Sequence, residues 1–580
     1  MRFSFHIPVV FAMGLLGTAA PAQEIPLRGW MQVDAGQDPC HNAHWQSARQ
    51  SVRVETTAPA AGEPVCRSFY VADSPNATDF AFRCAFTREA VQEGQSLAQA
   101  DFGIVLRWND AANYYALYFD GEDRVLLQRT TGGVAAEIAS CPGYAPIAAV
   151  TYLDAQLAGA HIRIRLNGRP LIDVTDTAFS AGRVGFFAGP GVSIRFDDIA
   201  LHDGASAPFL YVPLLILKLP YVLWTDDDEA VIMWETNRPV SAEVTYGEIG
   251  QEDTHSVAAP ADGCLQKVVL TGLTPNRRYG YRVKAEGRNR GGGEFYTRAA
   301  PGEPFTVGFI GGTRAYPEHF KQFAAMLLAR QPNFVVHLGD IVDRTTRLDQ
   351  WDELFFKPGE ALFGRVPAYL APGEHDASPN RHWFNAFLPY PGAGNERDNS
   401  GLSGYYAYPY GNAAFAILDT GFPLGPASPQ ARWLEETLRS PVFQNALWRI
   451  VCCHEPPYGI DRAQWKPGNA DVRTCVLPLC REYGVQLLVC GHEETYKRTI
   501  IDGVILIVNG AGIAEQDPET RRPGRVAQFA DQLFGYASLQ YSVMHIKGFG
   551  LEWTCYNSDN KRIDRFRLEQ GRTQPVATEQ

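Results

Sequence analysis

Four short clusters of carboxylate and imidazole side chains follow one another in the second half of this sequence. They cover residues 339–343 (GDIVD), 372–376 (PGEHD), 454–458 (HEPPY) and 491–494 (GHEE). Imidazole and carboxylate ligands together suit zinc, iron or manganese, whereas calcium prefers oxygen ligands alone. A single Gly-Asp pair or a lone histidine is usually a turn or a core residue, but four such clusters in order predict a metal centre.

Each cluster follows an apolar run that is typical of a buried strand. Such runs begin at residue 305 (FTVGFIGG) and alternate with segments of helical periodicity, for example residues 317–331 (PEHFKQFAAMLLARQ). The alternation predicts an α/β domain with a largely parallel sheet that helices cover on both faces. In this architecture ligands bind at the carboxyl ends of the strands, which is where the four clusters lie.

From residue 305 to about residue 500, the order of the clusters resembles the calcineurin-like metallophosphoesterases, purple acid phosphatases included. Neighbouring stretches such as YYAYPYGNAAFAILDTG and TYKR fit the same family. The resemblance implies that Asp340 is the carboxylate that bridges two metal ions, and that His454 and His492 are imidazole ligands of the second ion. It also implies that His375 is the catalytic residue that protonates the leaving group or stabilises the transition state.

Three positions depart from the family pattern. The aspartate after the first strand is replaced by Gly312, the asparagine ligand by Glu374, and the last histidine of the Gly-His-x-His motif by Glu494. In the family, that aspartate and that histidine bind the same ion, so both outright losses fall on one of the two metal sites. Glu374 adds an anionic ligand to the other site, which we expect to tighten the binding of a single ion.

The retained site offers two carboxylates and two imidazoles: Asp340, Glu374, His454 and His492. Glu494 and Asp343 are the remaining candidates for holding a second cation together with Asp340. We therefore expect a divalent metal centre with one or two ions of zinc, iron or manganese.

The first 22 residues have the features of a signal peptide. Arg2 precedes the apolar run 7–16, and the Ala-x-Ala cleavage pattern stands at residues 20–22, so the mature chain is expected to begin near Gln23. The only other apolar run, residues 209–224, contains prolines and a lysine and is too short to span a bilayer core of about 30 Å. We expect a secreted or periplasmic protein with no transmembrane segment after signal cleavage.

Two β-rich regions precede the α/β region. In residues 24–205, short alternating strands predict a jelly-roll sandwich, and LNGRPLIDVTD, GRVGFFAG and IRFDDIAL resemble laminin-G or concanavalin-like domains. Such domains often bind a glycan or a surface ligand, and a spacer without a ligand is an equally open reading. In residues 208–303, LTGLTPNRRYGYRV resembles a fibronectin-III-like domain, and together with LPYVLWTDDDEAVIMWET it resembles the N-terminal domain of purple acid phosphatases. The Gly-rich run 287–293 within them predicts a flexible loop.

The chain of 580 residues is expected to contain several domains. Their expected bounds are 1–22 for the signal peptide, 24–205 for the jelly roll, 208–303 for the fibronectin-III-like domain, 304–570 for the metallophosphoesterase domain and 571–580 for a polar tail. The formal net charge of −12 argues against nucleic acid as the main partner, because phosphate binding needs a basic surface.

Together these features predict an exported metallophosphoesterase-family hydrolase with an altered metal centre. It would act on phosphate mono- or diesters through a metal-activated water. The alternative is a family member that has lost turnover and acts as a binding protein for a glycan or surface ligand through its jelly roll.

Overall fold

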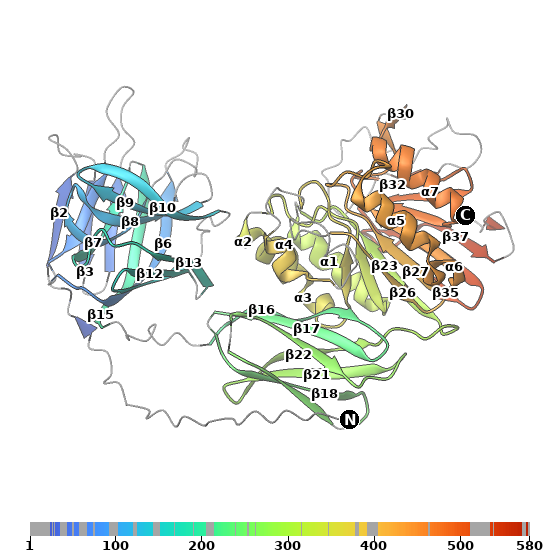
Figure 1. The fold of residues 1–580 in the computed structure, drawn as a ribbon, viewed down its shortest axis with the longest axis horizontal. Coiled ribbons are helices and arrows are strands. Elements are labelled where there is room, and N and C mark those ends of the chain that lie inside the picture. Colours follow the sequence, from blue (N-terminus) through green and yellow to red (C-terminus); the bar gives the residue numbers. More distant parts are fainter. Residues whose placement is uncertain are drawn as a thin grey trace, which may run out of the picture. The chain divides into compact units, whose positions relative to one another are not determined.

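The computed structural model of the chain forms two compact units, 1–141 with 146–213 and 142–145 with 214–580. The structure describes most of residues 24–570. The longest stretches outside the described residues are 1–23, 35–42, 57–66, 92–101, 143–150, 205–213, 391–403 and 511–533, and much of 571–580 is also outside. The predicted signal peptide at 1–22 therefore lies outside the described residues. Figure 1 shows both units, coloured along the chain.

The first unit consists of two sheets of antiparallel strands. The first sheet contains, in spatial order, β13 (Arg169–Thr175), β12 (His161–Leu166), β11 (Thr151–Ala158), β6 (Phe80–Val91), β15 (Val192–Asp203), β4 (Ser51–Thr56) and β3 (Ala43–Ala48), with β1 (Glu24–Ile25) paired to β15. The second contains β10 (Val134–Pro142), β9 (Arg124–Thr131), β8 (Asn113–Phe119), β7 (Phe102–Asp110), β14 (Arg183–Ala188), β5 (Ser68–Ala72) and β2 (Trp30–Asp34).

These two sheets share an aromatic core, as the alternating sequence pattern predicts. Buried and exposed residues alternate along β4 and β15, so one face of each strand points inward. Phe86 of the first sheet packs on Phe102 and Phe119 of the second, and Phe196 stacks on Phe186 at 4.1 Å between ring centroids. This arrangement is consistent with the predicted jelly-roll sandwich.

The second unit begins with two smaller sheets. One contains β16 (Ile216–Thr225), β17 (Glu229–Thr236) and β20 (Leu265–Thr271), and the other contains β19 (His255–Ala259), β18 (Ala242–Glu248), β21 (Arg278–Ala285) and β22 (Arg288–Tyr296). Both contribute to one hydrophobic core around the fully buried Trp234. The β-rich prediction is confirmed here, whereas the likeness to fibronectin III stays a prediction.

The Gly-rich run 287–293 was expected to be a flexible loop, and the structure corrects this. Most of the run belongs to β22, which pairs with β21. A Cβ at Gly293 would lie 1.8 Å from the carbonyl oxygen of Gly364, and one at Gly292 would lie 2.1 Å from that of Tyr281. The glycines therefore allow a close approach of two backbones, which composition alone does not reveal.

This β region is fastened to the rest of the second unit by buried polar contacts. Lys218, on β16, is fully buried and lies 2.7 Å from Glu235 and 2.6 Å from Asp352. The Tyr281 hydroxyl donates to the Gly364 carbonyl at 3.0 Å. Burying an ammonium group without partners costs on the order of several kcal/mol of folding free energy. The two carboxylates at this junction offset that cost.

The remaining residues form two mixed sheets, whereas the sequence pattern predicts a largely parallel sheet covered by helices on both faces. The first contains β25 (Ala368–Leu370), β24 (Phe334–His337), β23 (Phe305–Ile310), β35 (Gln540–Lys547), β36 (Gly550–Asn557), β37 (Arg562–Glu569) and β38 (Val576–Ala577). The second contains β26 (Tyr406–Tyr410), β27 (Ala413–Ile417), β28 (Trp448–Cys453), β31 (Leu487–Cys490), β33 (Val504–Asn509), β32 (Tyr496–Ile501) and β34 (Phe534–Tyr536). A short hairpin, β29 (Tyr458–Asp461) and β30 (Gln464–Pro467), stands apart.

The parallel strands lie at one end of the first sheet and in the middle of the second. Strands β25, β24 and β23 are parallel, and so are β27, β28, β31 and β33, whereas β35, β36 and β37 join the first sheet antiparallel. The two sheets pack on each other through aromatic rings, for example Phe334 with Tyr410 at 4.6 Å and with Phe415 at 5.2 Å. One face of each sheet is therefore covered by the other sheet.

Helices cover the outer faces of this sandwich (Figure 1). They are α1 (Pro317–Ala329), α2 (Leu348–Gln350), α3 (Lys357–Phe363), α4 (His382–Phe387), α5 (Pro429–Arg439), α6 (Pro441–Asn445) and α7 (Leu477–Glu482), with π-helical turns at Trp351–Phe356 and Val472–Val476. The Ser428 hydroxyl accepts from the Ala431 N–H at 3.1 Å and so caps α5. Leu434 and Leu438 of α5 lie in the core on the second sheet.

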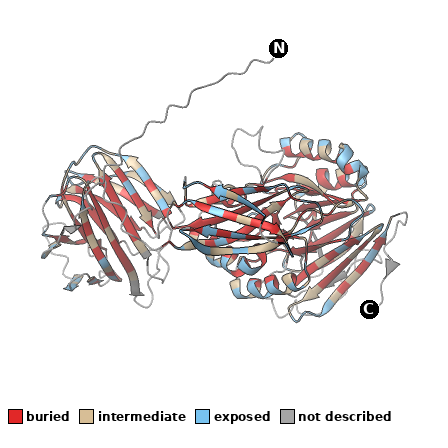
Figure 2. Ribbon diagram, turned by 90° about the horizontal axis from the view of Figure 1, so that it is seen from below, coloured by how far each residue is buried: buried red, intermediate tan, exposed pale blue. Residues whose placement is uncertain are grey.

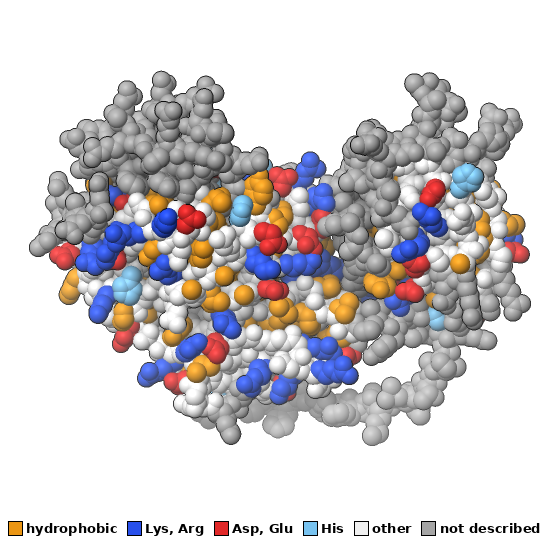
Figure 3. All heavy atoms as spheres, turned by 180° about the vertical axis from the view of Figure 1, so that it is seen from behind, with side chains coloured by type: hydrophobic (Ala, Val, Ile, Leu, Met, Phe, Trp, Pro, Cys, Tyr) orange, Lys and Arg blue, Asp and Glu red, His pale blue; other side chains and the backbone are white. Residues whose placement is uncertain are grey.

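Burial follows this layering. In Figure 2 the strands in the interior of each unit are coloured as buried, and the helices present alternating buried and exposed turns. On the face shown in Figure 3, positive and negative side chains of the described residues are interspersed. Among the described residues, no helix combines the length and the apolar character that crossing a membrane requires.

Candidate metal centre

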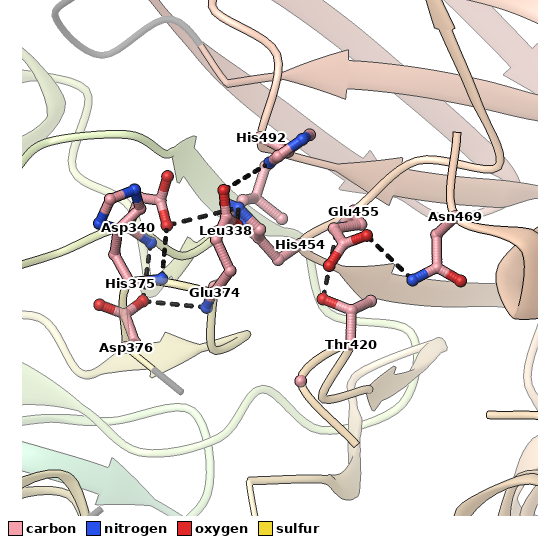
Figure 4. A network of polar contacts seen from close by, with 12 residues as sticks. Leu338, Asp340, Glu374, His375, Asp376, Thr420, His454, Glu455, Asn469 and His492 are labelled. Carbon is pink, nitrogen blue, oxygen red and sulfur yellow. Dashed lines mark hydrogen bonds and ion pairs between the residues drawn. The ribbon is translucent and has the colours of Figure 1, made fainter. Parts of the chain in front are cut away.

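The predicted site residues lie just beyond the carboxyl ends of parallel strands from both sheets of the sandwich. Asp340 follows β24 and Glu374 follows β25 in the first sheet, while His454 follows β28 and His492 follows β31 in the second. Figure 4 shows that these side chains point toward one another across the junction of the two sheets. Each sheet thus supplies one part of the cluster.

Glycines in the motifs allow the loops to come this close. A Cβ at Gly339, whose φ is +91°, would lie 2.3 Å from Nδ1 of His454. A Cβ at Gly373 would lie 2.4 Å from Oδ1 of Asp340. The glycines before Asp340 and Glu374 are therefore required by the packing of the site itself.

Glu374 lies between the two imidazoles. Its Oε2 is 2.6 Å from Nε2 of His454, and its Oε1 is 2.9 Å from Nδ1 of His492. The other ring nitrogen of His454, Nδ1, donates to the Leu338 carbonyl at 2.6 Å. This bond fixes the ring and directs Nε2 into the site, as the second hydrogen bond of a metal-binding histidine does.

Asp340 lies beside this trio and is 1% exposed. Its Oδ1 is 3.4 Å from Nε2 of His454, and the backbone N–H of His375 donates to the same oxygen at 3.4 Å. Its Oδ2 accepts a hydrogen bond from Nη1 of Arg314. Asp340 (φ 57°) and His492 (φ 66°) both have left-handed backbones, a strain that is typical of functional sites.

Asp376 is a structural member of the site that the sequence analysis did not single out. Its carboxylate accepts the backbone N–H groups of Asp340 (2.7 Å), Ile341 (3.0 Å) and Gly373 (3.0 Å). It therefore ties the loop of Asp340 to the loop of Glu374. Burial and the nearby charge of Asp340 raise the pKa of Asp376 to about 6. Its only signal in the sequence is its place at the end of the PGEHD cluster.

A second polar chain holds the loop of His454 from the other side (Figure 4). The Glu455 backbone N–H donates to the Thr420 hydroxyl at 3.4 Å, and its Oε2 accepts from the Asn469 amide at 2.9 Å. Glu455 thus supports the loop and is turned toward Asn469.

The electrostatics of the cluster favour a cation. Burial by itself would lower the pKa of His454, but Glu374 and Asp340 raise it to about 9. Burial would raise the pKa of Glu374, but the two histidines hold it well below its usual range. Nε2 of His454 is buried and lies 2.6 Å from Oε2 of Glu374 and 3.4 Å from Oδ1 of Asp340. Two carboxylates around an imidazole nitrogen fit a divalent metal such as zinc, iron or manganese.

The structure gathers five of the seven predicted residues. Ligand atoms within 4.8 Å of one another form two groups in the described residues, one of Glu374, His454 and His492 and one of Asp340, Glu374 and His375. Neither group includes Glu494, which is exposed, or Asp343, whose side chain is half exposed.

The ring of His375 is oriented by the loop of Asp343. Its Nδ1 lies 3.0 Å from the Asp343 carbonyl oxygen, which can only accept, so Nδ1 carries the proton. Nε2 is then the nitrogen left for other partners. The side chain is 31% exposed, which is compatible with access by a substrate.

Two family models match the chain. Residues 309–496 match the calcineurin-like phosphoesterase family, and residues 219–298 match the N-terminal domain of purple acid phosphatases. The chain carries a calcineurin-like phosphoesterase domain. The residues that match the purple acid phosphatase N-terminal domain directly precede it.

Individual relatives are distant. Purple acid phosphatase 21 of Arabidopsis thaliana is 23% identical over 350 residues, which is 56% of this chain and 76% of the relative. A nucleotide pyrophosphatase/phosphodiesterase of Hordeum vulgare is 23% identical over 273 residues, 41% of this chain and 72% of the relative. The structure of purple acid phosphatase PPD1 from yellow lupin superposes with a TM-score of 0.50 at 15% identity, covering 89% of this chain and 95% of that one. The last likeness shows a shared fold, and the relatives together support a metal-dependent phosphoesterase.

Proposed function

We propose that this chain is an exported phosphoesterase that hydrolyses phosphate mono- or diesters at a centre holding one divalent ion. The observation that carries the proposal is the position of Glu374, 2.6 Å from His454 and 2.9 Å from His492, with Asp340 beside it. These four residues would hold the ion. When bound, it would supply Lewis acidity toward a phosphoryl oxygen and an activated water.

His375 is the residue of the chain suited to the leaving group. With Nδ1 donating to the Asp343 carbonyl, Nε2 is the nitrogen left for the departing oxygen. In the cationic ring, which carries a proton on both nitrogens, Nε2 would hand its proton to that oxygen and leave the neutral ring with its proton on Nδ1. The contact between its backbone N–H and Asp340 keeps the ring next to the ion-binding residues. Asp376 holds the loop of Asp340 and the loop of Glu374 together through backbone hydrogen bonds, so that His375 and the ion-binding residues would contact the same ester.

The test is metal content measured together with turnover. The purified mature chain is expected to contain about one equivalent of zinc, iron or manganese by plasma mass spectrometry. It should hydrolyse p-nitrophenyl phosphate or bis(p-nitrophenyl) phosphate, and a chelator should remove the ion and the activity together. Retention of full activity after complete removal of metal would contradict the proposal.

N-terminal sequencing of exported protein should begin at or near Gln23, and an intact Met1 would contradict export.

A second candidate function, binding of a glycan through the first unit, has one observation in its favour. Tyr70 stacks between Trp30 and Trp45, at centroid distances of 5.4 and 5.1 Å, and all three are only partly buried. Tyrosine and tryptophan side chains that are only partly buried are common at binding surfaces. If this function holds, Trp45→Ala should abolish binding on a glycan array without changing ester turnover. Absence of binding by the unaltered chain would leave hydrolysis as the function.

A further inference from the structure

The loop after the first strand of the phosphoesterase domain carries an arginine beside the candidate metal centre. Residues 312–314 follow β23, and backbone hydrogen bonds of 2.9 and 3.1 Å fasten Gly312 and Arg314 to the loop of Asp340. Between them, the Thr313 hydroxyl lies 2.9 Å from Nε2 of the buried His337. Arg314 is therefore held at a defined place next to Asp340.

The two carboxylate oxygens of Asp340 face in different directions. Oδ1 lies 3.4 Å from Nε2 of His454, on the side of the retained metal site. Oδ2 accepts a hydrogen bond from the guanidinium of Arg314. The resemblance implies a carboxylate that bridges two ions, but here one oxygen faces the retained site and the other is bound to an arginine.

The side of the site with Arg314 is also the side that has lost its metal ligands. Gly312 has no side chain to offer, and Glu494 is exposed and belongs to neither group of close ligand atoms in the described residues. A second divalent ion on Oδ2 would have to displace the guanidinium or share the oxygen with it, at the cost of repulsion between like charges. The guanidinium, in contrast, keeps its charge at any physiological pH.

We propose that Arg314 takes the place of the second metal ion and binds a phosphoryl oxygen of the substrate. This inference rests on the proposed phosphoesterase function and extends it by one residue. The site is then a hybrid, with one exchangeable divalent ion on Oδ1 of Asp340 and one permanent guanidinium on Oδ2.

Arg314 has donors left for a substrate. A guanidinium carries five N–H groups, and among the described residues the only side-chain partner of this one is Asp340, through Nη1. The Arg314 side chain is 26% exposed, whereas that of Asp340 is 2% exposed, so the arginine is the member of this pair that solvent reaches. Two N–H groups on one planar edge match two oxygens of a phosphate, which is the geometry of strong arginine–phosphate recognition.

The first experiment measures metal stoichiometry by calorimetric titration of the apo full-length chain with Mn²⁺ and with Zn²⁺. The unaltered chain is expected to take up one equivalent. The double variant Gly312→Asp, Glu494→His, which keeps Arg314, should still take up one, and the same variant with Arg314→Gly should take up two. Two equivalents in the variant that keeps Arg314 would overturn the proposal, because the guanidinium would then not occupy the second position.

The second experiment measures the affinity of the metal-loaded chain for inorganic phosphate and needs only single variants. Arg314→Gln should weaken phosphate binding by about tenfold or more, the usual effect of losing a charge-assisted hydrogen bond. Arg314→Lys should recover part of the loss, since it restores the charge but not the planar fork. Arg365→Gln, at an exposed arginine in the same unit, is the matched control and should change nothing. Unchanged phosphate affinity in Arg314→Gln, with its fold checked by circular dichroism, would overturn the proposal.

These results separate the role of Arg314 from the proposed function. One equivalent of metal and Arg314-dependent phosphate binding without ester turnover would contradict hydrolysis and support the role of Arg314. Turnover that depends on two equivalents of metal in the unaltered chain would support hydrolysis and contradict the role of Arg314.

Discussion

The two halves of the candidate metal centre carry their positive charge differently. On one side, Glu374, His454 and His492 form a group that could hold a metal ion, and the buried His454 has a pKa raised to about 9 by Glu374 and Asp340. On the other side, Asp340 is neutralised by Arg314, which is part of the chain. The negative charge of carboxylates in such a site can thus be balanced by an ion from solvent or by a cationic side chain of the chain itself. Asp340 contacts both halves of the centre.

The two halves are expected to respond differently to metal concentration and to pH. We expect the half with His454 to depend on metal supply and on pH, because an imidazole must be neutral to bind a metal. The half with Arg314 depends on neither, because a guanidinium does not titrate in the physiological range. The predictions below test whether the two halves behave as differently as their geometry indicates.

The largest expected effect is the removal of a ligand from the first half. His454→Ala should lower metal affinity by about 100-fold or more, since it deletes a buried ligand and the hydrogen bond that anchors it to Leu338. Ester hydrolysis should fall with the metal content. Glu494→Ala, in the second half, is the matched control and should change metal affinity by less than about twofold, because Glu494 is exposed. Equal losses in the two variants would show that Glu494 is a ligand after all.

The next prediction concerns pH and applies to the first half only. In the metal-free chain His454 is protonated below about pH 9, so metal binding must displace a proton. Apparent metal affinity should therefore rise by about tenfold between pH 7 and pH 8 and level off above about pH 9. The raised pKa also means that the charged imidazole stabilises the metal-free fold below about pH 6.5, and that this contribution is lost as the pH rises through about 9.

Glu374→Asn tests the cause of that pH dependence. It removes the carboxylate nearest to His454, so the midpoint of the affinity curve should move to lower pH. Phosphate binding through Arg314 should keep its own flat profile over the same range, apart from the titration of phosphate itself. A midpoint that does not move in Glu374→Asn would show that another group sets the pKa of His454.

The sequence predicted the first half of the centre better than the second. His454 and His492 could be predicted because each directly follows an apolar run, and the ends of parallel strands meet at one edge. Arg314 and Asp376 could not, because their roles depend on which backbone lies opposite: Arg314 reaches Asp340, and Asp376 accepts N–H groups from two loops. A lone arginine after a strand has no spacing that distinguishes it from a solvated residue.

The fold shows the same division between local and long-range information. The apolar strands of the phosphoesterase domain could be recognised as apolar runs in the sequence. The second sheet and the antiparallel strands β35, β36 and β37 could not be predicted, because an apolar run does not determine which strand it pairs with. The Gly-rich run 287–293 looked like a loop because its pairing with β21 and its contact with Gly364 are supplied by distant residues.

Rebuilding the second half as a metal site should have a medium effect on catalysis. The combined change Gly312→Asp, Glu374→Asn, Glu494→His with Arg314→Gly restores the family ligands and removes the guanidinium. We expect a second bound ion and about tenfold faster hydrolysis of an activated phosphate ester, equal to about 1.4 kcal/mol of barrier. The same three ligand changes with Arg314 retained should give no such gain. A folded variant with two ions that is no faster than the unaltered chain would mean that the surrounding pocket limits the reaction.

The smallest expected effect is that of Gly312→Asp alone, and it isolates the backbone from the metal chemistry. Gly312 has a φ of +62°, a left-handed conformation that costs ordinary residues about 1–2 kcal/mol but that aspartate tolerates better than most. Gly312→Asp should therefore lower the free energy of unfolding of its domain by about 1 kcal/mol or less in urea titration. It should leave the metal stoichiometry at one, because the new carboxylate would lie beside Arg314 and Glu494 would still stand in place of the second imidazole.

Gly312→Ala is the control at the same φ. Alanine has no side-chain oxygen to stabilise the left-handed backbone, so this variant should be less stable than Gly312→Asp although it adds less volume. Equal stability of the two variants would mean that the backbone at 312 relaxes on substitution. In that case the loop could also release Arg314 from Asp340, and the distinction between an exchangeable and a permanent cation would be lost. Lower stability of Gly312→Ala, together with unchanged metal uptake in both variants, would show that the loop holds its conformation and keeps the arginine in place.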